Sequence, residues 1–269
     1  MKCAISNIAW TADQDVSVYQ LMKQYNYKGL EIAPTRIFPQ NPYGCLTEAR
    51  QWAENLKKQY GFTVCSMQSI WFGRTEKLFG SRQEQEALLT YTKMAVDFAA
   101  AIDCKNLVFG CPGNRALPEN ADLAKRQEGI AFFQAAGAYA EQNQTVIGME
   151  ANPSIYNTNY INTTQEALAL IRETETAGFG LNLDVGTMVE NGERVEILEG
   201  NAAYINHVHI SEPHLAPIVM SKKRRGLHQE LSCFLKENQY QGYISIEMGK
   251  TQDLVLLSEL LNYIREVFG

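Results

Sequence analysis

Short apolar, β-branched runs recur along this sequence, and segments with helical periodicity separate them. Each run has the usual length of a β-strand. The eight runs are Cys3–Trp10, Gly29–Ala33, Thr63–Gln68, Asn106–Gly110, Thr145–Glu150, Gly180–Asp184, Ile205–Ile210 and Tyr243–Glu247. Eight strands that each lead into a helix predict a closed (β/α)8 TIM barrel, with a doubly wound open sheet as the competing fold.

The segments between the runs carry apolar residues at the i, i+3, i+4, i+7 spacing of an amphipathic helix. Val18, Leu21, Met22 and Tyr25 follow it, and Thr163 with Glu166 has the spacing of a capping box. Glycine precedes four of the runs, where it tolerates the left-handed geometry that ends a helix. These four expected helix stops are Gly29, Gly61, Gly178 and Gly242.

The chain shows neither nucleotide-binding glycine motif, which disfavours the open sheet. It also lacks a Pro/Ser-rich linker and a low-complexity tract. We therefore expect residues 1–269 to form one domain.

The charge balance bears on possible partners. The chain has 24 Lys and Arg against 30 Asp and Glu, a net charge of −6. An acidic chain has no general basic footprint for a phosphate backbone, so we expect no nucleic-acid partner. The start of the chain has neither an apolar run long enough to span a membrane nor a signal-peptide pattern, so we expect no membrane association.

The six cysteines form no C-x-x-C pair, so the sequence signals neither a zinc clip nor a redox motif. We expect free, mostly buried thiols in a reducing cytoplasm. Self-association as a homo-oligomer stays open.

Polar side chains end the last four expected strands. They are Glu150, Asp184, His209 and Glu247. In a closed barrel these side chains converge at the C-terminal mouth, and charges there are costly unless they are paired or bind a cation. Three carboxylates and one imidazole predict a site for one divalent metal ion, Mn²⁺ first, with Mg²⁺, Co²⁺ or Zn²⁺ as alternatives. The competing interpretation is ion pairs with Lys or Arg.

His207 and His209 point the same way, because side chains alternate along a strand. We place His209 at the metal, since it is nearer the end of the strand. His207 is then a core histidine or a group that supports the site from below.

The motifs around these residues resemble the xylose-isomerase-like barrel superfamily, and its sugar isomerase/epimerase branch above all. The matching segments are Gly29–Ile32, Gly148–Pro153, Leu183–Gly186, His207–Ser211 and Gly242–Glu247. The resemblance implies a (β/α)8 barrel that binds one metal through Glu150, Asp184, His209 and Glu247. It also implies that Glu150 and Glu247 are the acid/base pair of a sugar or sugar-phosphate isomerase or epimerase working through a metal-stabilised enediolate.

The sequence departs from the epimerase pattern at three places. Thr187 stands where those enzymes carry a histidine after the aspartate, and Tyr156 stands roughly where a second glutamate is common. The loop after His209 lacks their early arginine, and the basic run Lys222–Arg225 comes later. That run is either a clamp for a phosphate or carboxylate, or a solvated loop.

Further residues are candidate contacts of a small carbohydrate substrate, each with a structural alternative. Arg115 binds substrate oxygens or pairs with Glu119, and Trp10 is a sugar-stacking wall or plain core. The full set of candidates is Glu31, Trp10, Arg115, Asn152, Thr187 and His207. For Glu31 the alternative is an ion pair or a supporting role, and for Asn152 it is orienting Glu150 or capping the turn at Pro153.

Three other functions compete with the isomerase. The first keeps the metal but makes the protein a dehydratase or C-glycoside lyase on a keto-sugar or inosose. The second is a catalytically silent partner subunit. The third, a DNA-repair nuclease with three zinc ions, is disfavoured because the chain has only four histidines.

Overall fold

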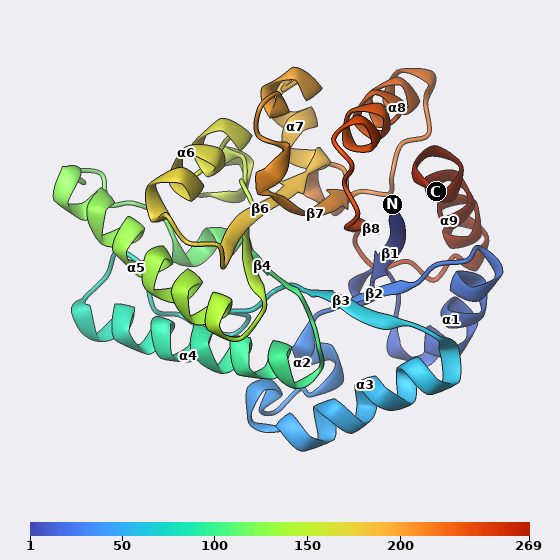
Figure 1. The fold of residues 1–269 in the computed structure, drawn as a ribbon, viewed down its shortest axis with the longest axis horizontal. Helices are drawn as coiled ribbons and strands as arrows, with labels where there is room; N and C mark the ends of the chain where they lie inside the picture. The colour runs from blue at the N-terminus through green and yellow to red at the C-terminus, as the bar shows by residue number, and fades with distance from the viewer.

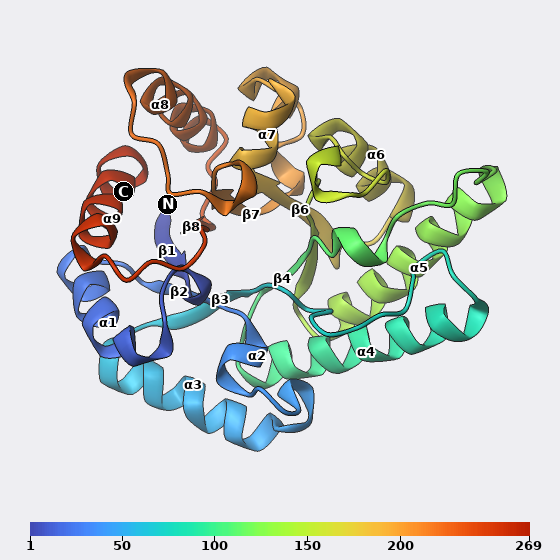
Figure 2. The same cartoon turned by 180° about the vertical axis from the view of Figure 1, so that it is seen from behind.

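A computed structural model describes residues 1–269, and its strands form one closed parallel barrel in the order β1 to β8. Figure 1 and Figure 2 show the ring of strands from its two ends, with helices around it. The strands are β1 Lys2–Ser6, β2 Gly29–Ile32, β3 Thr63–Met67, β4 Asn106–Phe109, β5 Val146–Met149, β6 Phe179–Asp184, β7 Ile205–Ile210 and β8 Tyr243–Ile246. The predicted (β/α)8 barrel is therefore confirmed, and the open sheet is excluded.

Nine α-helices connect or cover the strands. They are α1 Asp15–Gln24, α2 Pro34–Ile37, α3 Leu46–Tyr60, α4 Arg82–Ala101, α5 Leu123–Gln142, α6 Thr164–Thr174, α7 Val185–Asn191, α8 Lys222–Glu237 and α9 Leu254–Phe268. Short 3₁₀ turns lie in the loops between them, including Asn7–Ala9, Pro112–Asn114 and Pro213–Leu215. The predicted capping box at the start of α6 is confirmed, because Thr163 and Glu166 exchange hydrogen bonds with each other's backbone N–H.

The first and last strands close the ring. β1 pairs in parallel with β8, and Ile5 lies opposite Ile246 in the register. The N-terminal end of the chain lies beside α9 in both views (Figure 1, Figure 2). Closure leaves no strand edge exposed, so every strand contributes its C-terminal end to one mouth.

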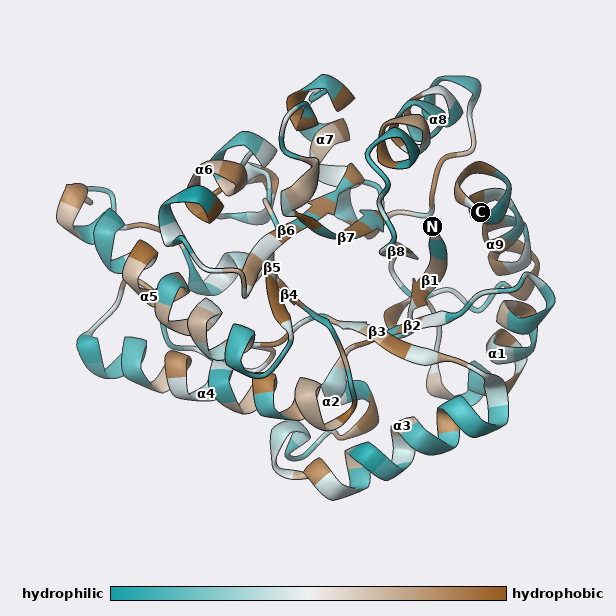
Figure 3. Ribbon diagram, in the orientation of Figure 1, coloured by the Kyte–Doolittle hydropathy of each residue, from teal (hydrophilic) through white to brown (hydrophobic).

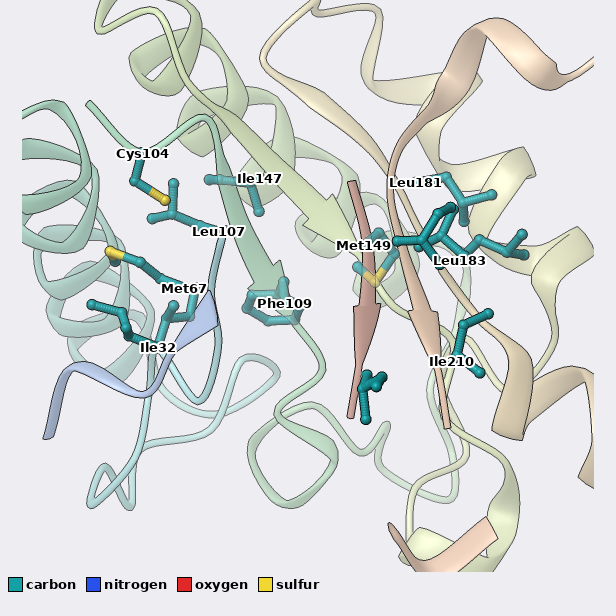
Figure 4. Close-up of a cluster of buried hydrophobic side chains, with 14 of the residues drawn as sticks. Ile32, Met67, Cys104, Leu107, Phe109, Ile147, Met149, Leu181, Leu183 and Ile210 are labelled. Carbon is teal, nitrogen blue, oxygen red and sulfur yellow. The ribbon is translucent and has the colours of Figure 1, made fainter. Parts of the chain in front are cut away.

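Side chains alternate between the helix-facing layer and the barrel interior. The helix-facing layer is apolar, and Figure 3 shows the hydrophobic strands inside helices that carry hydrophilic outer faces. Figure 4 shows part of this core, including Phe109, Met149 and Leu183, which are at most 1% exposed. Together with the inward faces of the helices, these residues belong to one cluster of 66 buried side chains.

The barrel interior is polar, whereas barrels of this kind are usually filled by branched aliphatic residues. Asn106 Nδ2 donates to Ser66 Oγ at 2.9 Å across the interior, and Gln68 Nε2 donates to Ser6 Oγ at 2.7 Å. The buried polar residues at interior positions are Ser6, Glu31, Ser66, Gln68, Asn106, Glu150, Asn182, His207, His209, Ser245 and Glu247. Such a filling requires mutual hydrogen bonding, because each unpaired buried polar group is costly.

The first strand is shorter than the sequence predicts. The expected run reached Trp10, but β1 ends at Ser6 and a 3₁₀ turn over Asn7–Ala9 follows. Asn7 stabilises the turn, since its Oδ1 accepts a hydrogen bond of 2.9 Å from the backbone N–H of Ala33. The strand and the turn are both largely buried, so both carry apolar residues and the apolar run does not show where the strand ends.

The glycine prediction is right at one position and wrong at three. Gly61 ends α3 with φ of 78°. The other three helices reach left-handed geometry three residues earlier, at Asn26, Glu175 and Gln239. The later glycines instead permit close packing: a Cβ on Gly29 would lie 2.6 Å from the Tyr243 ring, and one on Gly178 would lie 2.0 Å from the Gly137 carbonyl oxygen.

The basic run Lys222–Arg225 is not a loop. It forms the first turn of α8, which Ser221 caps by accepting a hydrogen bond from the N–H of Arg224. All six cysteines are free, and three of them are buried. None of the helices combines the length and the apolar character that crossing a lipid bilayer requires.

Candidate metal centre

The four polar residues at the ends of the last four strands meet at the mouth of the barrel. Glu150 directly follows β5, Asp184 ends β6, His209 lies in β7, and Glu247 directly follows β8. Each offers one ligand atom, and these atoms lie within 4.8 Å of one another. The strands therefore bring together the residues that the sequence singled out, and no Lys or Arg is ion-paired with any of the four.

The His209 ring is buried, and both of its nitrogens face carboxylates. Nδ1 lies 2.9 Å from Glu150 Oε1 and 3.2 Å from Glu247 Oε2. Nε2 lies 2.8 Å from Glu31 Oε2, on the side away from the cavity. A ring held in this way can donate from Nε2 to Glu31 and turn the Nδ1 lone pair toward a cation, which is the usual arrangement of a metal-binding histidine.

Glu31 occupies the layer below the four residues. Its side chain is fully buried, and Oε1 accepts a hydrogen bond of 3.1 Å from Gln68 Nε2. His207 Nε2 lies 3.1 Å from Glu31 Oε2, at an angle too poor for a regular hydrogen bond. Burial raises the pKa of Glu31, but His209 and His207 outweigh it and hold this pKa well below its ordinary value. Glu31 is thus an anion held between two imidazoles.

Backbone and hydroxyl donors orient Asp184. Its Oδ1 accepts a hydrogen bond of 2.6 Å from the N–H of Thr187 and so caps α7. Its Oδ2 accepts from the Ser211 hydroxyl. Gly186 makes this approach possible, because a Cβ there would lie 2.8 Å from Ser211 Oγ. The carboxylate is therefore fixed from two sides.

Two amides orient Glu150. Asn182 Nδ2 donates to Glu150 Oε1 at 2.8 Å, and Asn152 Nδ2 donates to Oε2 at 3.2 Å. Gly110 leaves room beside this carboxylate, since a Cβ there would lie 2.9 Å from Oε2. Asn152 Oδ1 is buried without a hydrogen-bond partner.

The charges at the centre fit a bound cation. Burial, followed by repulsion from Glu150, raises the pKa of Asp184 to about 6. Burial also raises the pKa of Glu247 to about 7, and Glu150 adds to the effect. Although burial lowers the pKa of His209, Glu247 and Glu31 raise it well above its ordinary value. Three buried carboxylates thus share one imidazolium as their positive charge. A divalent cation would supply that charge instead, and a hard, oxygen-rich donor set suits it.

A cavity of about 210 Å³ opens above the four residues. Three of the four residues, all except His209, line this cavity. Residues of the loops that follow several strands form the rest of its wall. The lining residues are Gln68, Ser69, Val108, Gly110, Cys111, Pro112, Glu150, Asn152, Tyr156, Asp184, Ser211, Glu212, Leu215 and Glu247. Nine of these 14 residues carry a hydroxyl, amide or carboxylate group, which suits a small polyhydroxylated molecule.

Of the predicted substrate contacts, only Asn152 lines the cavity. Glu31 and His207 lie one layer deeper. Thr187 is 2% exposed, and its hydroxyl donates to the Ala151 carbonyl oxygen at 2.7 Å. None of these three side chains lines the cavity.

Trp10 and Arg115 also lie outside the cavity lining. The Trp10 indole N–H donates to Oδ1 of Asp15, the first residue of α1, at 2.7 Å. Arg115 is fully buried and does not pair with Glu119. It donates instead to the carbonyl oxygens of Glu150 at 2.9 Å and Ile161 at 3.0 Å. Both side chains are occupied by structural contacts.

Sequence reasoning missed three residues that hold the centre, namely Asn182, Gln68 and Ser211. Asn182 lies two residues before Asp184 and therefore on the same side of β6, so the strand alternation contained this signal. Gln68 follows β3 as Glu150 follows β5. Ser211 follows β7 and ends the matching segment His207–Ser211, but the sequence gives no sign that its hydroxyl contacts Asp184.

Comparison with known proteins settles the family. The profile of the xylose isomerase-like TIM barrel family matches residues 19–267. The chain belongs to this family. The confirmed family agrees with the resemblance seen in the strand-end motifs.

Solved structures share the fold over the whole barrel. An E. coli 3-keto-D-glucoside 4-epimerase in its apo form is 19% identical, with a TM-score of 0.75 and 99% of each chain covered. A D-psicose 3-epimerase studied with D-fructose is 14% identical, with a TM-score of 0.77 and 100% of each chain covered. An AP endonuclease of family 2 from Brucella melitensis is 16% identical, with a TM-score of 0.70, covering 100% of this chain and 97% of its own. No curated protein matches the sequence significantly.

Proposed function

We propose that this protein is a divalent-metal-dependent isomerase or epimerase of a small keto-sugar. The observation that carries the proposal is the convergence of Glu150, Asp184, His209 and Glu247 within 4.8 Å, beneath a polar cavity. These four residues would hold the cation, with Mn²⁺ as the first candidate. The fold neighbours named as keto-sugar epimerases support the same class of reaction.

The bound cation would act as a Lewis acid that stabilises negative charge developing on substrate oxygens. Glu150 and Glu247 would move the proton. They reach the cavity from β5 and β8, strands that are separated in the ring by β6 and β7. One carboxylate takes the proton from the carbon beside the carbonyl, and the other returns a proton. Return to the same carbon from the other face is epimerisation, and return to the neighbouring carbon is isomerisation.

Glu150→Gln and Glu247→Gln test the acid/base assignment. Each change keeps the shape of the side chain but replaces the basic carboxylate by an amide that does not accept a proton near neutral pH, so turnover should fall about 10²–10⁴-fold. The measurement is uptake of solvent deuterium into D-fructose or D-psicose by Mn²⁺-loaded protein, with metal content determined for each variant.

Glu54→Gln, an exposed position on α3, is the matched control and should keep full activity. Full turnover in both Glu150→Gln and Glu247→Gln would contradict the assignment. An absence of divalent metal binding in the unaltered protein would contradict the whole proposal.

A second candidate is a metal-dependent dehydratase or C-glycoside lyase in the same barrel. The observation in its favour concerns Thr187, which stands where the epimerases carry a histidine. Its hydroxyl donates to a backbone carbonyl oxygen and it does not line the cavity, so this position supplies no acid/base group. Product mass separates the two candidates, because isomerisation leaves the mass unchanged and dehydration lowers it. An inosose incubated with the Mn²⁺-loaded protein is the direct probe.

A further inference from the structure

The charged side chains that line the cavity are all acidic. Four of its lining residues are carboxylates, namely Glu150, Asp184, Glu212 and Glu247. No Lys, Arg or His side chain contributes to the lining. Three ionised carboxylates around a divalent cation still leave one negative charge in excess, so a bound metal does not make this wall attractive to an anion.

One of the four acidic lining residues, Glu212, is bound by Arg224. Arg224 Nε lies 2.8 Å and Arg224 Nη2 lies 2.7 Å from the two oxygens of Glu212. This is the fork geometry in which an arginine binds a carboxylate or a phosphate with two parallel hydrogen bonds. Glu212 is 4% exposed, and its Oε1 also accepts a hydrogen bond of 3.1 Å from the N–H of Val219. The guanidinium is therefore bound to a carboxylate that lines the cavity, and it does not itself line the cavity.

The other arginines nearby are committed elsewhere. Arg115 is fully buried and donates to two backbone carbonyl oxygens. Arg225 lies 3.6 Å from Glu266 of α9 and stacks on Tyr263 at 4.7 Å. Neither of these two guanidinium groups is therefore directed at the cavity, whose lining itself contributes no basic side chain.

We infer that the substrate is an uncharged keto-sugar rather than a sugar phosphate, and that Glu212 determines this specificity by holding Arg224 away from the ligand. The inference rests on the proposed function and narrows its substrate class. A phosphate group in the cavity would meet carboxylates of like charge and lose its hydration without gaining a partner, and both effects oppose its binding.

The experiment compares D-fructose with D-fructose 6-phosphate as probes, and D-psicose with its 6-phosphate. Mn²⁺-loaded protein is assayed for solvent deuterium uptake and for kcat/KM with each member of a pair. For the unaltered protein we expect kcat/KM for the phosphate to be at least tenfold lower than for the free sugar. Equal or faster turnover of the phosphate would overturn the inference and leave the proposed function standing.

Variants test the role of Glu212. Glu212→Gln removes the charge that holds the guanidinium, so the ratio of phosphate to free-sugar kcat/KM should rise about tenfold. The double variant Glu212→Gln with Arg224→Met should lose this gain, because the released guanidinium is then absent. Glu196→Gln, which breaks the exposed pair with Arg194, is the matched control and should leave the ratio unchanged.

The possible results separate the role of Glu212, the substrate class and the proposed function. A ratio that stays constant in a folded Glu212→Gln protein contradicts the role of Glu212. If that variant does not fold, the comparison of the two sugars in the unaltered protein still decides the substrate class. Absence of turnover with every free and phosphorylated sugar contradicts the proposed function, and the inference falls with it.

Discussion

His209 shows how one side chain can depend on another that never meets the substrate. Its Nε2 lies 2.8 Å from Glu31, and this contact decides which ring nitrogen carries the proton and which is free for a cation. Glu31 is itself fixed by Gln68 at 3.1 Å. The orientation of the imidazole is thus set from inside the barrel, by a glutamate that does not line the cavity and a glutamine that does.

Glu31→Gln should weaken metal binding about 10–100-fold, the usual cost of losing a partner of a metal-bound histidine. The glutamine keeps the size of the side chain but removes the charge that holds the Nε2 proton. Isothermal titration of metal-free protein with MnCl₂ measures the dissociation constant. Glu54→Gln serves again as an exposed control. An unchanged dissociation constant in a folded Glu31→Gln protein would show that Glu31 does not position His209.

At the scale of elements, Arg115 joins two loops at the mouth. It follows β4, and it binds the carbonyl oxygen of Glu150 after β5 and that of Ile161 before α6. Burial lowers the pKa of Arg115 to about 10, so the side chain remains charged near neutral pH. The cost of burying the charge is offset because its hydrogen bonds satisfy loop carbonyls that no strand or helix reaches.

Arg115→Met should therefore destabilise the fold by about 2–3 kcal/mol, since two buried carbonyls lose a charged donor. Urea unfolding with an unchanged slope should show this as a lower midpoint. Arg126→Met, at an exposed position on α5, should stay within about 0.5 kcal/mol of the parent. Equal stability of the two variants would mean that water replaces the guanidinium at no cost.

The contact between α8 and α9 contains a buried histidine. His228 Nδ1 lies 2.8 Å from the Tyr263 hydroxyl, and the ring is fully buried. Burial, together with Arg224 and Arg225, lowers the pKa of His228 to about 4. The ring is therefore neutral in the folded protein at pH values where an unfolded chain already binds a proton.

Because the unfolded state binds more protons between pH 6.5 and pH 4, His228 makes stability fall as the pH drops through this window. The full loss is about 3 kcal/mol. Urea unfolding of the parent and of His228→Gln across pH 4 to 7 should show a smaller pH dependence in the variant. His214→Gln, at an exposed histidine, should behave like the parent. Parallel curves for all three proteins would refute the assignment.

The elements differ in how far the sequence predicts them. Strand alternation and helical spacing predict the barrel because both report local periodicity, and Gly61 and the Thr163–Glu166 cap are local as well. The contacts of Arg115 and Arg224 were not predicted, since each side chain reaches a loop that lies far away along the chain. The sequence predicted that Asp184 ends a strand. It did not predict the hydrogen bond from Ser211, because Ser211 follows the neighbouring strand β7.

For the whole molecule, a cation at the mouth would link four strands through their candidate ligands. Three of these ligands are carboxylates, which repel one another when no cation is bound. Saturating Mn²⁺ at about 1,000 times its dissociation constant should add about 4 kcal/mol of stability. The melting temperature should then rise by about 8 °C or more. The rise should be larger at pH 8 than at pH 5.5, because protons on Asp184 and Glu247, with pKa values of about 6 and 7, compete with the metal.

Differential scanning fluorimetry with and without a chelator measures this effect, and Asp184→Asn should lose most of it. A shift of equal size in Asp184→Asn would place the stabilising ion elsewhere.

The pairing of β1 with β8 has a consequence for biosynthesis. The barrel cannot close during synthesis before β8 has been made, because Ile5 of β1 pairs with Ile246 of β8. Glu247 follows directly after that closing strand. A growing chain therefore contains three of the four ligands before the strand that closes the barrel is made, and it gains the fourth only with that strand.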